Sequence, residues 1–275
     1  MTKLPFQAIK LTLFFTWTLI NFTSTQLWAQ TAQPTANQNR GRVLFSPPKE
    51  QEPSGEDRGT PGNREGAGKR PSGSNCKEVD KPLTALVPAT KSKSVLDLTI
   101  SESVLGLTVN EHPTFWFYVP YKSPLVAEFK LLNENDEEIY KTTFPLSEKL
   151  GVVSISLPSA PKIKPLETDK QYHWFFSIVC DPNSRSADVD VEGWVKRVVQ
   201  SRDMMSHPET QIQRSRIVSY AKNGIWYETV TFLGDRLRAN PADKAIAMDW
   251  EDLLQSIGLD DIAKEPIVQH YTPEK

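Results

Sequence analysis

Three carboxylates and one tryptophan alternate along a single stretch of the chain. Asp188, Asp190, Glu192 and Trp194 stand two residues apart, so their side chains share one face if the stretch is a β-strand. An indole ring can stack on a sugar while carboxylates accept its hydroxyls, and a carboxylate pair can also act as acid and base in glycoside cleavage. The competing interpretation is a solvated strand face whose tryptophan covers part of a helix. We take these four residues as the candidate binding site, with a hydrolase as the weaker alternative.

The polar loop before this stretch matches part of a calcium-binding loop. Asp181, Asn183 and Glu192 fall at positions one, three and twelve of an EF-hand loop. Arg185 stands at a ligand position, and Ser186 replaces the glycine of the sharp turn. These departures favour a polar turn with a local Asp–Arg pair over a calcium site.

Other signs of catalysis or metal binding are missing from the sequence. The four histidines are His112, His173, His207 and His270; they form no i, i+4 pair, and neither HExxH nor G-x-S-x-G occurs. His173 lies among aromatic residues, where a packed or surface histidine is commoner than a catalytic base. We therefore predict no catalytic residue, no metal ligand and no cofactor, and a protein that is not an enzyme.

The N-terminal segment has the order of a secretory signal. Lys3 and Lys10 precede an apolar run from Leu11 to Ile20, and Leu27-Trp28-Ala29 offers a cleavage point. The run is shorter than the roughly 20 residues that span a membrane. We expect residues 1–29 to be removed and the mature protein to be periplasmic or extracellular, with no membrane span. An uncleaved anchor is the alternative.

The net charge and the cysteine content further limit the partners and the kinds of site that the chain can have. The net charge of −2 gives no basic surface for nucleic acid, so no nucleic-acid partner is expected. Cys76 and Cys180 are the two cysteines, and in an oxidising compartment they can form a disulfide. Two unpaired buried thiols remain the alternative, whereas two lone cysteines lack the spacing of a zinc site.

Residues 30–75 are rich in Gln, Asn, Pro, Gly, Ser and charge. Val43-Leu44-Phe45 is their single apolar cluster, so the segment cannot offset its ordering entropy and is predicted to be a disordered linker. The glycine-rich run Gly59–Arg70 ends near a lysine but lacks the Walker spacing. A flexible linker is the favoured interpretation of this run, and a docking peptide is the alternative.

Residues 76–199 have the pattern of a β domain. Two segments, Phe115–Tyr118 and Tyr172–Phe176, are aromatic at successive positions, which is typical of strands covered on both faces. Leu166 precedes Tyr172 by six residues, the pattern of a tyrosine corner. We therefore predict a mainly β fold, an immunoglobulin-like antiparallel β-sandwich. Its predicted strands lie at Leu83–Val87, Thr114–Val119, Ala127–Leu131, Ile139–Phe144, Val153–Leu157, Tyr172–Cys180 and Asp188–Val199.

Residues 200–265 change to a helical period. Ser206 with Glu209 suggests a capping box, Asn223-Gly224 a helix end and Asn240-Pro241 the next start. Two apolar stripes follow the helical spacing, namely Trp226, Val230, Leu233, Leu237 and Ile246, Trp250, Leu253, Ile257. Each stripe needs a surface to cover, so we predict a small helical subdomain packed on the outer face of the aromatic strands. Residues 266–275 are predicted to be a tail.

Several segments together resemble the exported cyanobacterial family called domain of unknown function 928. The resemblance runs from about Gly59 to Ile262 and rests on the segments Cys76 with Leu83–Pro88, His112–Pro120, Ser177–Pro182, Glu192–Val195 and Tyr220–Tyr227. It implies an exported cyanobacterial protein. The family has no established activity, so the resemblance assigns no functional residue.

These observations favour a non-catalytic extracytoplasmic protein-interaction module. The alternative is a carbohydrate- or peptide-binding β-sandwich domain that uses an exposed Trp194 or Trp116. A hydrolase on the acidic strand is the weakest of the three.

Overall fold

The computed structural model describes residues 41–48, 61–66, 75–93, 100–161, 163–200 and 212–272. They form ten strands and three α-helices, so the prediction of a mainly β protein with C-terminal helices is confirmed. The strands are β1 (Thr84–Ala85), β2 (Ala89–Lys93), β3 (Ile100–Thr108), β4 (Thr114–Val119), β5 (Val126–Leu132), β6 (Glu138–Pro145), β7 (Gly151–Ser156), β8 (Gln171–Val179), β9 (Val189–Arg197) and β10 (Ile267–Tyr271). The helices are α1 (Ile212–Lys222), α2 (Trp226–Ala239) and α3 (Lys244–Gln255), with a short 3-10 turn, η2 (Arg185–Ala187).

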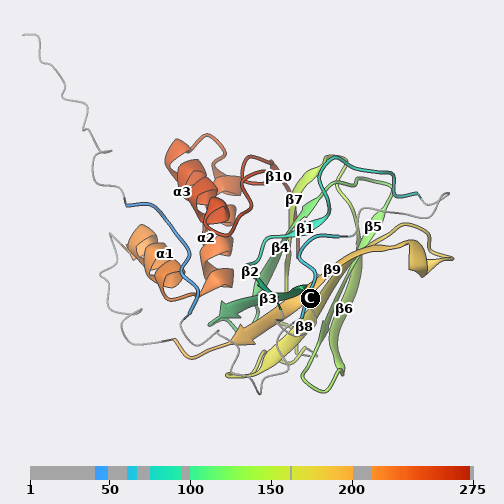
Figure 1. Cartoon of the computed structure of the whole chain (residues 1–275), viewed down its shortest axis with the longest axis horizontal. Helices are drawn as coiled ribbons and strands as arrows, with labels where there is room; N and C mark the ends of the chain where they lie inside the picture. The colour runs from blue at the N-terminus through green and yellow to red at the C-terminus, as the bar shows by residue number, and fades with distance from the viewer. Residues whose placement is uncertain are drawn as a thin grey trace, which may run out of the picture. The chain divides into compact units, whose positions relative to one another are not determined.

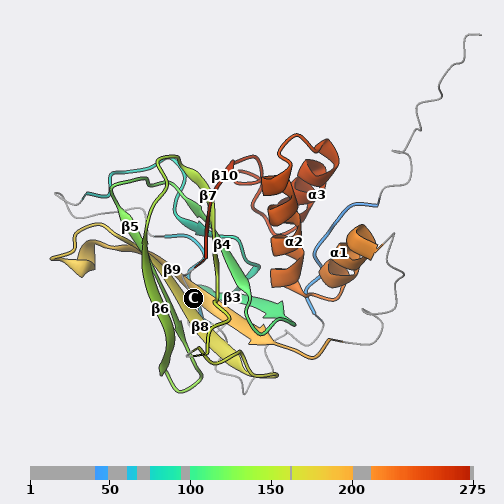
Figure 2. The same cartoon turned by 180° about the vertical axis from the view of Figure 1, so that it is seen from behind.

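The strands form two mixed sheets, with the three helices gathered beside one of them (Figures 1 and 2). The smaller sheet has the order β1-β4-β7-β10, and the larger has the order β2-β3-β9-β8-β5-β6. Most neighbours are antiparallel, but β3 runs parallel to β9 and β10 runs parallel to β7. The purely antiparallel arrangement predicted from sequence is therefore wrong, because β3 and β10 each pair with a strand that is far away in the chain, and such a pair needs no hairpin.

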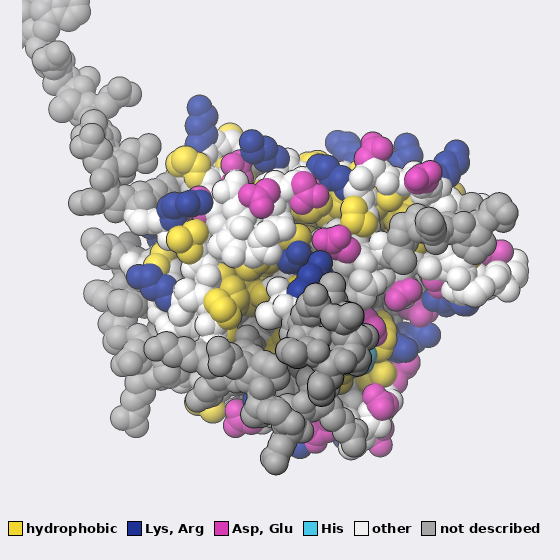
Figure 3. All heavy atoms as spheres, in the orientation of Figure 1, with side chains coloured by type: hydrophobic (Ala, Val, Ile, Leu, Met, Phe, Trp, Pro, Cys, Tyr) yellow, Lys and Arg dark blue, Asp and Glu magenta, His cyan; other side chains and the backbone are white. Residues whose placement is uncertain are grey.

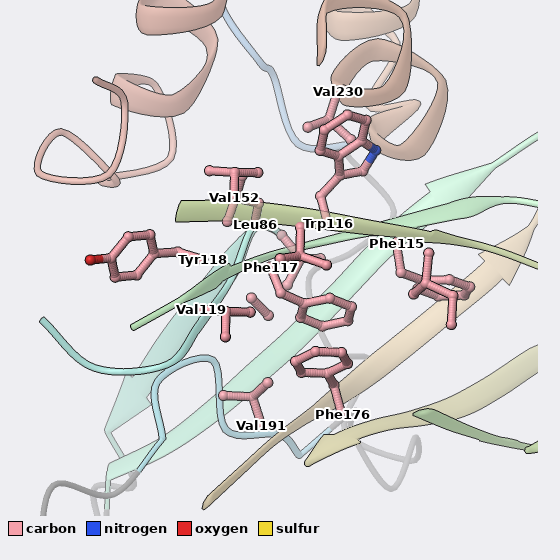
Figure 4. Close-up of a cluster of buried hydrophobic side chains, with 14 of the residues drawn as sticks. Leu86, Phe115, Trp116, Phe117, Tyr118, Val119, Val152, Phe176, Val191 and Val230 are labelled. Carbon is pink, nitrogen blue, oxygen red and sulfur yellow. The ribbon is translucent and has the colours of Figure 1, made fainter. Parts of the chain in front are cut away.

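The side chains of β4 are buried on both faces of the smaller sheet. Phe117 stacks on Phe176 of β8, with ring centroids 4.0 Å apart, and so holds the two sheets together. Trp116 points the other way, toward the helices (Figure 4), where its ring meets the edge of Trp250 at 5.7 Å. The predicted cover on both faces is confirmed for this strand.

The second aromatic strand, β8, is covered on one face only. Its alternate residues Tyr172, Trp174 and Phe176 are buried between the sheets, whereas His173 and Phe175 are half-buried on the outer face. The prediction of two covered faces is therefore wrong for β8, because in the described residues helix α2 packs against β4 and β3 rather than against β8. His173 and Phe175 therefore lie on the outer face of the larger sheet, away from the smaller one.

Two local constraints hold the ends of β8. Cys180, just after the strand, forms a disulfide with Cys76, and both residues are buried. At the other end the Tyr172 hydroxyl accepts a hydrogen bond from the Glu167 backbone N–H at 2.9 Å, which is the contact expected of a tyrosine corner. Both predictions, the disulfide and the corner, are confirmed.

Helices α2 and α3 follow the two predicted apolar stripes. Gly224 and Gly258 lie at φ of 72° and 73°, in the left-handed region where glycine commonly ends a helix. The start predicted at Asn240-Pro241 is wrong, because Asp243 caps α3 by accepting from the N–H groups of Ala245 and Ile246. The capping box proposed at Ser206 and Glu209 lies outside the described residues.

Residues 266–275 are more than a tail. The segment Ile267–Tyr271 forms β10, which pairs with β7 and adds a strand to the smaller sheet. The Tyr271 ring also stacks on Phe144 of β6 at 4.3 Å. The sequence pattern missed this strand because it follows the helices, where no neighbouring hairpin or turn indicates a return to the sheet.

Two parts of the predicted linker pack on the folded domain. In residues 61–66, Asn63 pairs with Glu192 of β9, and Gly66 donates its N–H to the Leu83 carbonyl. A Cβ on Gly66 would lie 2.8 Å from Val189, so glycine permits this close approach. Residues 41–48 also pack, with Val43 fully buried. The disordered linker is thus corrected at these two places, and the rest of residues 30–75 lies almost wholly outside the described residues.

The helices α1, α2 and α3 are 11, 14 and 12 residues long. Among these residues no helix is both long and apolar enough to cross a membrane. The signal peptide predicted for residues 1–29 lies outside the described residues and stays a prediction.

Candidate functional site

Three of the four predicted site residues lie on the outer face of the larger sheet. Asp190, Glu192 and Trp194 alternate on β9 with the buried residues Val191 and Val195. The fourth, Asp188, precedes the strand. The structure therefore brings three of the predicted side chains onto one face, as their spacing indicated.

Asp188 belongs to a turn. Its carboxylate accepts a hydrogen bond from the Cys180 backbone N–H at 3.1 Å and forms an ion pair with Arg185. This ion pair is the local Asp–Arg contact that the loop sequence predicted. In the parts of the chain that the structure describes, no group of three or more His, Cys, Asp or Glu side chains is placed to hold a metal ion.

The acidic residues of β9 face aromatic neighbours. The His173 imidazole stacks on the Trp194 ring at 4.3 Å, and its Nε2 lies 3.2 Å from a Glu192 carboxylate oxygen. The Trp194 indole N–H donates to the Pro61 carbonyl at 2.9 Å. One face of the ring and its polar edge are thus engaged by the protein, which leaves Trp194 less available for a ligand than the sequence suggested.

Asp190 has the most altered electrostatic surroundings on this face. Loss of water around the carboxyl group raises its pKa, and the charges of Glu192 and Asp188 raise it further. A raised carboxyl pKa is one mark of a functional site. A role for Asp190 in binding or catalysis stays a prediction.

A cavity of about 390 Å³ lies elsewhere, between α1, α2 and the loop that joins β3 to β4. Sites for small molecules commonly range from about 300 to 1,000 Å³. The residues that line it are Asn110, Pro113, Thr114, Arg216, Tyr220, Tyr227, Glu228, Thr231, Phe232, Asp235 and Arg236. None of them was a predicted site residue.

The spacing of the lining residues explains how the helices build this cavity. Glu228, Thr231 and Asp235 follow the i, i+3, i+7 spacing on α2, so they share one face of the helix. Arg216 and Tyr220 are four residues apart on α1 and likewise share a face, with the Arg216 Nε donating to the Tyr220 hydroxyl at 3.1 Å. The cavity thus lies between two helix faces and one loop.

Glu228 has the more deeply buried of the two carboxyl groups in this wall. Its Oε1 accepts hydrogen bonds from the Thr108 hydroxyl at 2.7 Å and from the N–H groups of Val109 and Asn110 at 3.0 and 2.9 Å. Oε2 is buried and has no hydrogen-bond partner among the described residues. Burial raises the pKa of Glu228, although its hydrogen bonds act in the opposite direction. The carboxyl group is therefore easier to protonate than an exposed glutamate.

The arginines supply positive charge to the cavity. Neither Arg216 nor Arg236 forms an ion pair with a carboxylate within the described part of the chain. Asp235, which lines the same cavity, is paired with Arg238 at 2.9 Å. Arg236 lies over the Phe232 ring at 5.6 Å. The cavity therefore combines uncompensated guanidinium groups with aromatic walls.

Sequence reasoning missed this site for a physical reason. A glutamate in the first turn of a helix is common because it complements the helix dipole, so Glu228 gave no signal of its own. The polar stripe of Glu228, Thr231 and Asp235 beside the apolar stripe of α2 could have been noticed. The loop that closes the cavity, however, is more than a hundred residues away in sequence.

The fold and these sites define a two-sheet β domain with a C-terminal layer of helices. The chain belongs to the family described as Domain of Unknown Function (DUF928), whose model matches residues 65–267. The match includes both cysteines and every residue that lines the cavity, but it does not reach residues 41–48. Comparison with curated proteins gave no match.

Proposed function

We propose that this chain is an exported, non-catalytic protein-interaction module whose helical layer binds extended segments of protein. The observation that carries the proposal is that residues 41–48 pack against that layer. This segment, drawn in blue, passes beside α1 and α2 as an extended stretch of chain in both views (Figures 1 and 2). The helices therefore form a surface able to hold an extended peptide.

The contacts of this segment combine apolar anchors with backbone hydrogen bonds. Val43 is fully buried, and Phe45 meets the edge of the Trp226 ring at 5.2 Å. The Phe45 N–H donates to the Ser256 hydroxyl, and the Ser46 N–H donates to the Ala221 carbonyl, each at 3.0 Å. Peptide-binding grooves use this same division, with main-chain bonds for affinity and alternate side chains for specificity.

Export is supported by the N-terminal pattern and by the disulfide. Disulfides persist in oxidising compartments, and Cys76 pairs with Cys180. N-terminal sequencing of the protein from periplasm or culture medium tests this part of the proposal. We expect the mature chain to begin near Gln30, and a chain that keeps Met1 would contradict export with cleavage.

The finer fold assignment supports an interaction domain too. We propose an immunoglobulin-like sandwich, because the order β6-β5-β8-β9 matches the C′CFG order and the β4–β7 pair matches strands B and E. The parallel strands β3 and β10 are departures from the simplest form of that fold. Binding of a glycan at Trp194 is less favoured, because its ring is stacked on His173 and its N–H is already bonded.

The groove is tested by peptide exchange on the intact fold. A protease site introduced between residues 49 and 60 allows the connection to residues 41–48 to be cut after folding. A labelled peptide of the sequence Gly41–Pro48 should then exchange into the groove, as measured by fluorescence anisotropy. The control peptide carries serine in place of Val43 and Phe45 and should not bind. Equal binding of the two peptides, or none of either, would refute the proposed groove.

On the face drawn in Figure 3, basic and acidic side chains are interspersed among hydrophobic ones over the described residues. Such a mixed surface supports a protein partner better than a strongly charged polymer. A partner segment with the apolar spacing of residues 41–48 is the occupant we propose, and it would have to displace those residues.

A further inference from the structure

The cavity between α1, α2 and the β3–β4 loop lies apart from the peptide groove. The groove is built from residues such as Ala221, Trp226 and Ser256, none of which lines the cavity. The cavity lies instead along the face of α2 that carries Glu228 and Asp235. The two sites can therefore be tested separately.

The size of the cavity and the unpartnered oxygen of Glu228 are both suited to a ligand larger than water. A cavity of about 390 Å³ is much larger than the roughly 30 Å³ that one water molecule takes in the liquid. Buried polar atoms almost always have a hydrogen-bond partner, yet Glu228 Oε2 has none among the described residues. Oε2 has almost no accessible surface, so a small rotation of the Glu228 carboxyl group would let a ligand in the cavity supply that partner.

The charged residues that line the cavity indicate whether its ligand is an anion or a cation. Arg216 uses its Nε for the Tyr220 hydroxyl, while the described residues offer no carboxylate partner to its terminal nitrogens. Arg236 is likewise without a carboxylate there. Guanidinium groups bind carboxylate and phosphate through paired hydrogen bonds. Asp235 does not favour a cation, because Arg238 already neutralises it.

We propose that this cavity binds a small organic anion. Its carboxylate or phosphate group lies between Arg216 and Arg236, its apolar body packs against Phe232 and Tyr227, and an acceptor atom faces Glu228. The Tyr227 side chain is buried and provides a fixed aromatic wall. The protonated Glu228 then donates a hydrogen bond to the ligand from Oε2, since Oε1 already accepts three hydrogen bonds.

The raised pKa of Glu228 is compatible with this ligand. An ionised Glu228 would repel an anion in the same cavity, whereas a protonated one both removes the repulsion and supplies a donor. The other titratable groups that line the cavity are Arg216, Tyr220, Tyr227, Asp235 and Arg236. The paired Asp235 is the one other carboxylate among them.

The binding test compares three probes that share a phenyl group. Phenylacetate and phenyl phosphate carry an anion, and 2-phenylethylamine carries a cation of similar size. Each is titrated into the mature chain and followed by NMR chemical-shift changes. We expect one or both anions to bind with a dissociation constant of about 1 mM or tighter, and the amine to bind at least about tenfold more weakly. The stronger of the two anions identifies the preferred head group.

Matched variants connect the binding to the arginines. The double variant Arg216→Gln/Arg236→Gln should weaken anion binding at least about tenfold. The control variant Lys222→Gln/Lys244→Gln removes the same charge from exposed positions of α1 and α3 and should change binding less than about twofold. Glu228→Gln keeps an acceptor and places an amide donor at Oε2, so it should retain binding. Thermal melts of all variants verify that each one folds.

Three results would overturn the proposal. The first is that neither anion binds at about 10 mM. The second is that the amine binds as tightly as the anions, which would remove the role of the arginines. The third is that the arginine and lysine double variants lose affinity equally, which would show that net charge alone attracts the probe. The peptide exchange described above does not depend on any of these results, so the two proposals fail separately.

Discussion

The two aromatic strands β4 and β8 are alike in sequence but differ in what covers them. Each has buried residues between the sheets, where Phe117 of β4 stacks on Phe176 of β8. On its other face β4 buries Trp116 beneath the helices, with 2 % of the residue exposed. The other face of β8 leaves His173 and Phe175 half-buried. The comparison shows that an aromatic run indicates a strand, while the neighbouring elements decide how many of its faces are buried.

The largest effect on the free energy of unfolding is expected when one aromatic residue on the outer face of each strand is replaced by alanine. Trp116→Ala removes a buried ring that contacts Trp250 and whose N–H donates to the Thr231 hydroxyl at 3.0 Å. We expect it to lower the free energy of unfolding by about 3–5 kcal/mol. Phe175→Ala should cost about 1 kcal/mol or less, because its ring is half-buried. Urea denaturation measures both, and equal losses would contradict the proposed difference in cover.

The disulfide is expected to be the next largest contribution, and it acts at the end of β8. Cys76 and Cys180 are 104 residues apart in sequence, so the bond constrains a long loop of the unfolded chain. Replacing both residues with serine should lower the free energy of unfolding by about 2–4 kcal/mol. Reductant should produce a similar loss in the unaltered protein and no further loss in the serine variant. An effect of reductant on that variant would show that the loss arises elsewhere.

The cover over β4 can be tested from the helix side. A Cβ on Gly234 of α2 would lie 2.7 Å from the Trp116 ring, so Gly234→Ala should cost about 1–3 kcal/mol through overpacking. When Trp116→Leu is introduced first, the same alanine should become neutral or stabilise by up to about 1 kcal/mol, because alanine favours a helix more than glycine does. A double-mutant cycle of thermal or urea melts provides the measurement. An unchanged penalty in the Trp116→Leu background would exclude the ring as its cause.

The smallest expected effect is a pH dependence of the free energy of unfolding. It arises from Glu228, which lines the cavity beside α2. Burial raises the pKa of Glu228 above its ordinary value of 4.5, so the folded state holds this proton more tightly than the unfolded state. Its contribution to stability is complete below pH 4.5 and is lost as the pH rises through the folded-state pKa. Glu228→Gln removes this dependence, so the stability of the unaltered protein should fall relative to the variant as the pH rises above 4.5.

The control for this prediction is a glutamate on α3 that does not line the cavity. Glu251→Gln makes the same chemical change there and serves as the matched variant. Chemical denaturation at a series of pH values gives the three curves. A Glu228→Gln curve parallel to that of the unaltered protein would contradict the effect of burial.

Local patterns were sufficient to predict many of the elements. Alternation located β5 and β6, the spacing of Trp226, Val230 and Leu233 located α2, and the interval from Leu166 to Tyr172 indicated the corner. These signals depend on residues that are close in sequence, so a single strand or helix carries them completely. The same reasoning placed Asp190, Glu192 and Trp194 on one face of β9.

The contacts that join distant segments were not predictable in this way. The buried position of Val43, the pairing of Asn63 with Glu192 and the return of β10 to the sheet each depend on a partner far away in the chain. A polar segment can be ordered when an existing surface satisfies its backbone hydrogen bonds. The composition of such a segment therefore indicates only that it has no core of its own.

The sequence by itself determined the β domain followed by helices, the corner at Tyr172 and the aromatic strands, because each follows from residue type at short spacing. It left the disulfide between Cys76 and Cys180 as one of two alternatives, because the two residues are 104 positions apart. Only the tertiary structure decided which face of each aromatic strand is covered and where residues 41–48 pack. It alone also assembled a cavity from Arg216, Glu228 and Asn110. These features depend on surfaces brought together across long loops, and the geometry of that assembly is not present in any local pattern.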